Sequence, residues 1–400
     1  MPKFLFPSAL LGVCLVACGG DGSEKAGNAG PDEEPPDTTI RMVEADSPLI
    51  EYVGRVGFSY PKSPEYSSPA VKVRVRFKGV GVAVHFEDQF AYGTNKNYFD
   101  AVLDGEVLPK VEPTMGVTRY ELATELDYGE HELSFVKRTE ASIGRTLFTG
   151  IEVQGELVPP PGPKARKIEI IGDSISCGGG VEATTTAQCT EGAGGWGVPH
   201  NNARLAFGSL VAENLDADYH VTAVSGIGLL RNYSDMYDAR PMPEVYDTRF
   251  LQSMSSPLID PQAFVPDAIL IVLGTNDFSP GDNPPEDPRE PMDVAEYAEA
   301  YIAFIDQLLA DDHYPDAHIF ALGSPMLTDG WPSATDTFRA DLESALTLVE
   351  EHYAAEGNTQ VHKLFVPKVP GRGCGTHPGV DEHAETATLV EPFVRETMGW

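Results

Sequence analysis

The sequence predicts two folded domains, an N-terminal all-β sandwich of the jelly-roll type and a C-terminal α/β domain whose parallel sheet has helices on both faces. Three observations predict them. Residues 40–158 contain short alternating strands separated by turn signals. Residues 159–163 read Pro-Pro-Pro-Gly-Pro, which forms a stiff linker. Beyond residue 167 the pattern changes to strands that alternate with helices.

Alternation in the N-terminal domain is clearest in residues 71–77, where Val and Phe alternate with Lys and Arg. Asp104-Gly105 predicts a hairpin turn, because glycine adopts a positive φ at little cost. No long helical period interrupts this region, so the sandwich is placed at residues 39–158 and the linker at residues 159–166. Further strands are predicted at residues 80–86, 98–103 and 132–137.

The C-terminal domain, residues 167–400, is long enough to hold a doubly wound sheet. Its predicted strands are residues 167–171, 219–224, 268–273, 318–322 and 361–366. Its predicted helices are residues 203–215, 294–309, 335–354 and 380–396. In such a sheet the carboxyl ends of the strands meet at one edge, where ligands bind.

The first residues read as an export signal. Lys3 precedes a short apolar run that ends Leu15-Val16-Ala17-Cys18, which resembles a bacterial lipobox. That resemblance implies cleavage after residues 1–17, lipidation of Cys18, and an exported protein anchored to a bacterial membrane, at the outer membrane or cell surface. The alternative is an ordinary signal peptide that contains a cysteine. Residues 18–38 are polar and predict a disordered tether.

The chain is strongly acidic, with 61 Asp and Glu against 28 Lys and Arg and a formal net charge of −33. This charge repels phosphate backbones and anionic lipid, so it argues against a nucleic-acid partner and against any membrane contact other than the lipid on Cys18. A highly solvated surface, suited to a salty habitat, is the simplest interpretation. After the signal, no apolar stretch is long enough to cross a bilayer.

Three cysteines remain once Cys14 and Cys18 are set aside: Cys177, Cys189 and Cys374. In an oxidising compartment they allow one disulfide and one free thiol. Cys177 with Cys189 is the local choice, but the sequence leaves the pairing open. No Cys-x-x-Cys or clustered histidine pattern predicts a metal site, and no cofactor is expected.

Four residues of the C-terminal domain supply the groups that acyl transfer needs. Ser174 follows the first strand, in Gly-Asp-Ser, and predicts a nucleophile. His377 precedes the last helix and predicts its general base. Gly226 and Asn276 follow two further strands and, with the N–H of Ser174, predict donors to an oxyanion.

With these four residues in this order, the chain resembles the SGNH (GDSL-type) hydrolase superfamily and, more narrowly, carbohydrate esterase family 2. The resemblance implies a β-sandwich joined to an SGNH domain and deacetylation of plant cell-wall polysaccharides such as xylan or glucomannan. It also implies an acetyl-serine intermediate and no metal. Further matching stretches are residues 52–55, 136–140, 225–228, 231–232 and 398–400.

One departure concerns the histidine. SGNH hydrolases usually carry an aspartate three residues before it, and here that residue is Cys374. The resemblance to family 2 implies a Ser174–His377 dyad in which backbone carbonyl groups orient the imidazole. Asp381 and Glu382 are the alternative carboxylates, although they more simply begin the last helix, where negative charge is favourable.

Other residues receive secondary predictions. Asp173 and Asp277, beside Ser174 and Asn276, are expected to hold loops by hydrogen bonds. Predicted substrate contacts are Trp331, Arg231 and Asn232, with Trp196 as a weaker candidate. The leading function is a carbohydrate O-acetyl esterase that acts on acetylated polysaccharide or oligosaccharide; the alternatives are an SGNH esterase for envelope sugars or lipids and a surface glycan-binding lipoprotein with an idle site.

Overall fold

The structure is a computed structural model that describes residues 37–192, 195–234, 240–251, 255–284, 287–330 and 332–400. All of these residues lie within one unit, Asp37–Trp400. The predicted signal peptide (residues 1–17), Cys18 and Trp331 lie outside the described residues. Within the described part of the chain, no helix has the length and apolar character needed to cross a membrane.

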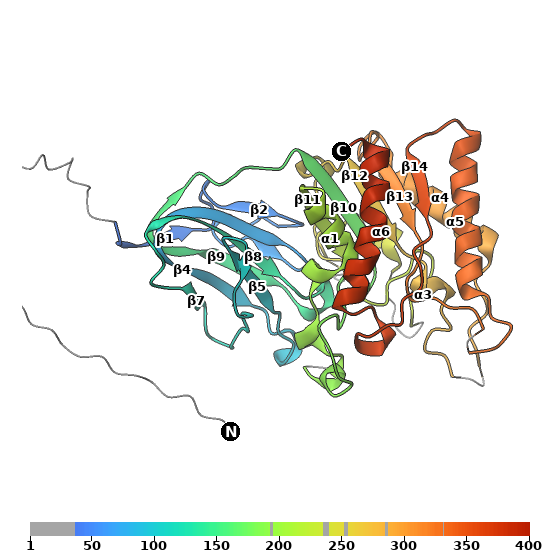
Figure 1. Cartoon of the computed structure of the whole chain (residues 1–400), viewed down its shortest axis with the longest axis horizontal. Helices are drawn as coiled ribbons and strands as arrows, with labels where there is room; N and C mark the ends of the chain where they lie inside the picture. Colours follow the sequence, from blue (N-terminus) through green and yellow to red (C-terminus); the bar gives the residue numbers. More distant parts are fainter. Residues whose placement is uncertain (1–36, 193–194, 235–239, 252–254, 285–286, 331) are drawn as a thin grey trace, which may run out of the picture. The chain divides into compact units, whose positions relative to one another are not determined.

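The N-terminal domain is an antiparallel β domain organised on two long strands, β4 (Lys72–Asp88) and β9 (Thr146–Val158) (Figure 1). The sheet order is β1-β9-β4-β8-β5-β6, with β2 and β7 paired to β4 and β3 paired to β9. The other strands are β1 (Ile40–Glu44), β2 (Glu51–Val53), β3 (Glu65–Tyr66), β5 (Phe99–Leu103), β6 (Glu106–Val107), β7 (Arg119–Ala123) and β8 (Gly129–Lys137).

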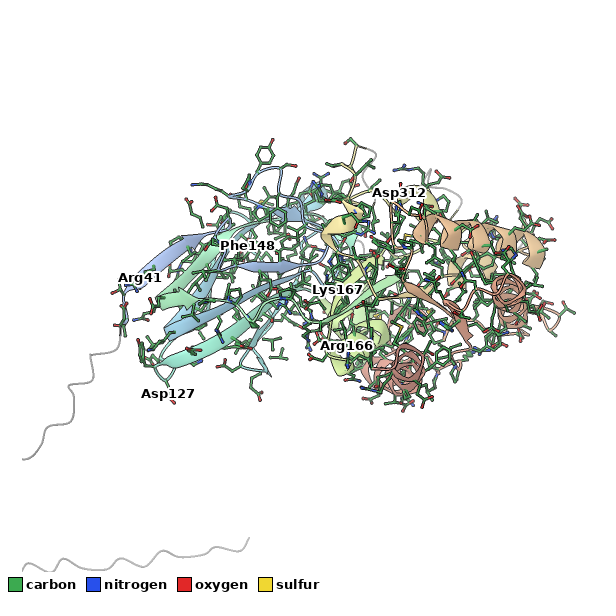
Figure 2. All side chains as sticks on the ribbon, turned by 90° about the horizontal axis from the view of Figure 1, so that it is seen from above. Arg41, Asp127, Phe148, Arg166, Lys167 and Asp312 are labelled. Atoms are coloured by element: carbon green, nitrogen blue, oxygen red, sulfur yellow. A yellow bond between two sulfur atoms is a disulfide. The ribbon has the colours of Figure 1, made fainter. Side chains whose placement is uncertain are left out.

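Strand β4 corrects one prediction, because the strands expected at residues 71–77 and 80–86 are a single strand. Its register with β9 shifts between Gly79 and Gly81, so the strand continues through a bulge instead of ending. A Cβ atom on Gly79 would lie 2.2 Å from the carbonyl oxygen of Gln154, so only glycine fits there. The alternating apolar face packs into a core that includes the fully buried Phe148 (Figure 2).

The C-terminal domain has a five-stranded parallel sheet in the order β11-β10-β12-β13-β14 (Figure 1). Its strands are β10 (Arg166–Gly172), β11 (Ala217–Ala223), β12 (Ala268–Val272), β13 (His318–Leu322) and β14 (Val361–Leu364). Its helices are α1 (Phe207–Asn214), α2 (Met242–Val245), α3 (Thr275–Phe278), α4 (Val294–Leu308), α5 (Phe338–Ala355) and α6 (Val380–Met398). The predicted α/β architecture is confirmed.

Alternation along β10 divides the core of this domain in two. Ile168 and Ile170 belong to a cluster with the buried side chains of α1 and α6, whereas Ile171 belongs to a cluster with α4 and α5. Because successive side chains of a strand point to opposite faces, helices cover both faces of the sheet, as predicted. At the start of the strand, the N–H of Lys167 donates to Asp267 (2.8 Å) and Arg166 donates to the carbonyl of Leu215 (2.6 Å) (Figure 2).

Buried ion pairs connect the two domains. Arg55, from the segment after β2, lies 3.1 Å from the carboxylate of Glu169 on β10, and both are nearly inaccessible. That carboxylate also accepts hydrogen bonds from Tyr246 (2.7 Å) and Thr222 (2.6 Å). A buried charge of this kind is stable only with several partners, so the strand that leads to Ser174 depends on an arginine of the β domain.

Candidate active site

Ser174 lies in the tight turn that follows β10. Gly172 ends the strand, and a Cβ atom there would lie 2.2 Å from the hydroxyl of Ser176, so the turn requires glycine. The carboxylate of Asp173 is fully buried and accepts the N–H of Ile175 at 2.9 Å, which fixes the turn on its buried side. Burial raises the pKa of Asp173 to about 7. This loop-holding role is the one expected from the sequence.

His377 meets Ser174 from the loop before α6. Its Nε2 lies 2.6 Å from the hydroxyl oxygen of Ser174, and its Nδ1 lies 2.7 Å from the carbonyl oxygen of Cys374. A carbonyl only accepts, so Nδ1 carries the proton and Nε2 is left to accept from the serine. Burial lowers the pKa of His377, which keeps the imidazole neutral and able to act as a base.

The two carboxylates that follow His377 do not reach its ring in the hydrogen bonds of the described residues. Glu382 is fully buried and accepts the backbone N–H groups of Gly371 (3.1 Å), Arg372 (2.8 Å) and Gly379 (2.8 Å). Asp381 is exposed in the first turn of α6. The acceptor that orients the imidazole is therefore a backbone carbonyl.

The predicted oxyanion donors Gly226 and Asn276 follow β11 and β12, the two strands that flank β10. Gly172 pairs with Ala223 of β11 and with Val272 of β12, so the segments that carry Ser174, Gly226 and Asn276 leave the sheet at one level. Gly226 has φ +79°, in the left-handed region that favours glycine. The structure thus brings Gly226 and Asn276 to the same edge as Ser174.

Asn276 already makes two contacts through its side-chain amide. Nδ2 donates to the carbonyl of Ile227 at 2.7 Å and lies 3.3 Å from a carboxylate oxygen of Asp173. The short bond fixes the amide against the Gly226 loop. The contact with Asp173 is longer and therefore the weaker of the two.

Asp277 holds the loop that follows Gly226. Its carboxylate accepts three consecutive backbone N–H groups, those of Leu229 (3.0 Å), Leu230 (2.7 Å) and Arg231 (2.9 Å). Burial raises the pKa of Asp277, and these backbone bonds oppose that rise. The residue is fully buried, so the predicted structural role agrees with its surroundings.

Arg231 and Asn232, two of the predicted substrate contacts, take part in the same loop. Arg231 donates to the backbone carbonyls of Asp277 (2.8 Å) and Glu290 (2.7 Å). The side-chain oxygen of Asn232 accepts the N–H of Gly228 at 2.9 Å. These bonds hold the loop and do not test whether either side chain also contacts substrate, so both assignments stay predictions.

The β domain contributes one residue to this site for which sequence reasoning assigned no role. Glu140, within the matching stretch 136–140, is 7% exposed, and its carboxylate accepts the N–H of Ser225 at 2.5 Å. Ser225 directly precedes Gly226, so the bond fixes the peptide group next to the one that carries the Gly226 N–H, a predicted oxyanion donor. The resemblance of residues 136–140 to carbohydrate esterase family 2 was the signal in the sequence, and it does not show that this stretch lies against the sheet edge.

The structure settles the pairing that the sequence left open. Cys189 and Cys374 form a disulfide with Cα atoms 5.2 Å apart. The local pairing is not formed, because Cys177 is a fully buried free thiol in the core beneath the nucleophile turn. The disulfide joins the loop after Ser174 to the residue whose carbonyl contacts His377.

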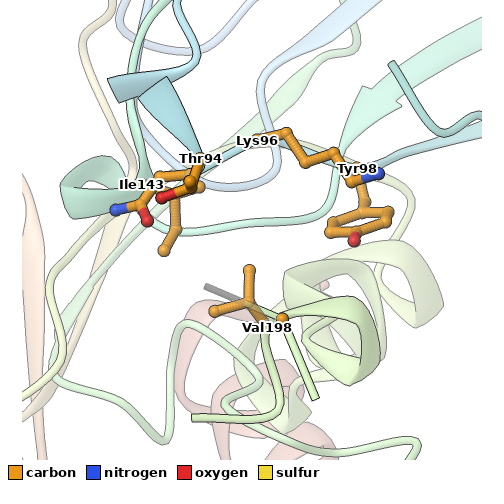
Figure 3. Close-up of a pocket in the computed structure, with 7 residues that line it drawn as sticks. Thr94, Lys96, Tyr98, Ile143 and Val198 are labelled. Atoms are coloured by element: carbon orange, nitrogen blue, oxygen red, sulfur yellow. The ribbon is translucent and has the colours of Figure 1, made fainter. Parts of the chain in front are cut away.

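A small cavity lies where the β domain meets this same loop, between Thr94, Lys96, Tyr98 and Ile143 on one side and Val198 on the other (Figure 3). Its volume of about 40 Å³ suits one or two waters and is far below the roughly 300 Å³ of small-molecule sites. Neither Ser174 nor His377 lines it. Among the described residues, no group of three or more His, Cys, Asp and Glu side chains could hold a metal ion.

Two family models match the chain, one to each domain. The model described as "Carbohydrate esterase 2 N-terminal" matches residues 52–161, and that of the GDSL-like Lipase/Acylhydrolase family matches residues 170–379. The second match covers more than half of the chain and includes Ser174, Gly226, Asn276 and His377.

Named relatives agree with these matches. The chain is 31% identical over 363 residues to cellulase/esterase CelE of Acetivibrio thermocellus, covering 89% of this chain but only 40% of that longer protein. It is 26% identical over 369 residues to an acetylxylan esterase / glucomannan deacetylase of Cellvibrio japonicus, covering 91% of this chain and 93% of the relative.

A solved structure extends the agreement to three dimensions. A family two carbohydrate esterase from Clostridium thermocellum in complex with cellohexaose superposes with a TM-score of 0.76 at 30% identity, covering 88% of this chain and 99% of the other. With both domains matched along nearly their whole length, the chain belongs to carbohydrate esterase family 2, and its α/β domain is a GDSL-like hydrolase domain.

Proposed function

We propose that this esterase removes O-acetyl groups from plant cell-wall polysaccharides such as xylan or glucomannan, with Ser174 as nucleophile and His377 as general acid and base. The observation that carries the proposal is the continuous chain of hydrogen bonds from the hydroxyl of Ser174 through the imidazole to the carbonyl of Cys374. Relatives named for acetylxylan and glucomannan support the choice of substrate.

The reaction proceeds in two halves. Nε2 of His377 takes the proton of Ser174 as the serine oxygen attacks the acetyl carbonyl, and the protonated imidazole then donates to the departing sugar oxygen. A water molecule, deprotonated by the same nitrogen, then attacks the acetyl-serine; the bond to the serine oxygen breaks, acetate leaves, and Nε2 returns its proton to Ser174. In both halves the negative oxygen accepts from the N–H groups of Ser174 and Gly226 and from Nδ2 of Asn276.

Exposed aromatic side chains near this edge are candidates for contact with sugar rings. Tyr233 is 43% exposed, and its N–H donates to the carbonyl of Gly226 at 2.8 Å. Trp196 is 81% exposed and precedes Gly197, where a Cβ atom would lie 2.9 Å from the sulfur of Cys374. Stacking on a sugar ring is a common use of such side chains. Replacing either with Ala is expected to raise KM for acetylated xylan and to leave hydrolysis of 4-nitrophenyl acetate unchanged.

The proposal extends to the location of the enzyme. Export of the chain and lipidation of Cys18 would bring the active site to polymers that cannot enter a cell, and a disulfide beside the histidine suits an oxidising compartment. Metabolic labelling with a fatty acid is expected to mark the wild-type chain but not Cys18→Ala. Label that persists in the variant would exclude this anchor.

The central test compares acetate release by wild-type protein and Ser174→Ala. We expect the wild-type enzyme to release acetate from acetylated xylan and from 4-nitrophenyl acetate, and the variant to lose activity by at least ~10³-fold with its circular dichroism unchanged. Ser176→Ala, two residues away in the same turn, is the matched control. Full activity in Ser174→Ala would exclude the proposed nucleophile, and faster turnover of octanoate than acetate esters would favour a lipid substrate.

A further inference from the structure

The disulfide Cys189–Cys374 ends on the residue that orients the catalytic histidine. Cys374 is 8% exposed, its carbonyl oxygen accepts from Nδ1 of His377 at 2.7 Å, and its side chain is bonded to Cys189. Cys374 also stands three residues before the histidine, where related hydrolases carry an aspartate. One residue therefore provides the acceptor through its backbone and a covalent anchor through its side chain.

A carbonyl in this loop needs an anchor because the neighbouring backbone is exposed and unusual. Gly375 and Thr376, the next two residues, are both exposed and both have positive φ, +58° and +63°. For threonine this is a strained conformation. The peptide group that bears the Cys374 carbonyl lies between Cys374 and Gly375, and its oxygen also accepts the N–H of His377 at 3.1 Å. Both hydrogen bonds of this oxygen lead to His377, so the placement of the carbonyl and the imidazole together depends on how firmly Cys374 is held.

Two glycine-containing segments, at Gly180 and Gly197, contact the N–H and the side chain of Cys374. Its N–H donates to the carbonyl of Gly180 at 3.3 Å, a long bond. A Cβ atom on Gly180 would lie 2.4 Å from Cβ of Cys374, and one on Gly197 would lie 2.9 Å from its sulfur, so both glycines leave room for the bridge. Glu382 holds the two ends of the loop, through the N–H groups of Gly371 and Arg372 before Cys374 and of Gly379 after His377.

We propose that the Cys189–Cys374 disulfide is a positioning element of the catalytic site. It fixes the Cys374 carbonyl against Nδ1 of His377, so that this carbonyl orients the imidazole as an aspartate does in related hydrolases. The inference rests on the proposed roles of Ser174 and His377. Reduction by a dithiol reagent transfers two electrons and two protons to the bridge, gives two cysteine thiols, and leaves the reagent as its own disulfide. The freed carbonyl then samples orientations in which it no longer selects the Nδ1–H tautomer.

The direct test is Cys189→Ser, which breaks the bridge without changing residue 374. With 4-nitrophenyl acetate we expect kcat to fall roughly tenfold to a hundredfold and KM to stay the same, which is less than the ~10⁴-fold cost of the wrong tautomer in a triad. The matched control is Thr186→Ala, at an exposed position of the loop that carries Cys189, which keeps the bridge and is expected to keep kcat. The low-field proton resonance of His377 Nδ1–H is expected in the wild-type and control spectra and absent from the Cys189→Ser spectrum.

Reduction of the wild-type protein supplies a second route that changes no residue. After treatment with dithiothreitol and its removal by gel filtration, two additional thiols per chain and the same fall in kcat are expected, and reoxidation restores both. Unchanged kcat in the reduced protein would overturn the proposal, as would a loss of activity that follows unfolding by circular dichroism. If wild-type protein releases no acetate, or Ser174→Ala remains active, the proposed function fails instead.

Discussion

The two sides of Ser174 are held in different ways. On the oxyanion side, buried carboxylates accept backbone N–H groups: Glu140 fixes Ser225, and Asp277 fixes the three residues from Leu229. On the histidine side, the imidazole is oriented by a carbonyl, and that carbonyl belongs to a residue in a disulfide. In the described hydrogen bonds, the carboxylates of this site accept from backbone N–H groups and from the Asn276 amide, and none contacts the imidazole.

This difference explains how a dyad can be adequate. A carboxylate beside the imidazole would stabilise its protonated form, whereas a carbonyl supplies the same tautomer selection with less charge. The pKa of His377 is accordingly lowered by burial, with only backbone carbonyls to raise it. In the proposed dyad the imidazole is therefore oriented without a charged group beside it.

Among the residues that support Ser174 and His377, Glu140 is expected to give the largest effect when it is replaced. In Glu140→Ala, Ser225 loses its acceptor and the Gly226 N–H drifts, so kcat for 4-nitrophenyl acetate should fall about 10²-fold, near the cost of one lost oxyanion donor. Glu140→Gln keeps an acceptor oxygen, so its kcat should lie between those of the wild-type protein and Glu140→Ala. Because Ser225 is exposed, water can satisfy its N–H and the fold should persist.

Glu106→Ala is the matched control for that experiment. Glu106 lies exposed on β6 of the same domain and should leave kcat unchanged. Equal activity of Glu140→Ala and Glu106→Ala would show that the β domain supports the α/β domain without influencing its chemistry.

An effect of intermediate size is expected on the pH dependence of kcat/KM, through the protonation of His377. Because His377 works in its neutral form and burial lowers its pKa, activity should fall only as the pH drops below about 6.5, the ordinary value for histidine. The acid limb of kcat/KM for wild-type protein measures this. Asp173, whose pKa is raised to about 7 by burial, is the competing group. A limb near pH 7 that disappears in Asp173→Asn would assign it to the aspartate and contradict the prediction.

These contrasts also show how far sequence reasoning reaches. The strands ending at Ser174, Gly226 and Asn276 could be placed because β-branched runs and the residues after them are local signals, and parallel strands bring their carboxyl ends together. Glu140 could not be placed, since a contact across 85 residues and a domain boundary leaves no local trace. The Cys189–Cys374 pairing escaped for the same reason, because the bonded residues are 185 apart.

The smallest effect is expected at Asp381, the exposed carboxylate that follows the histidine. Asp381→Ala should leave kcat within about twofold and reduce the free energy of unfolding by at most ~1 kcal/mol, the value of a charge in the first turn of a helix. Its neighbour separates the two kinds of role. Glu382 is fully buried and accepts three backbone N–H groups around the loop, so Glu382→Ala should lower the melting temperature by more than Asp381→Ala does. A hundredfold loss of kcat in Asp381→Ala would mean that this carboxylate reaches the imidazole during turnover, and the dyad would then be a triad.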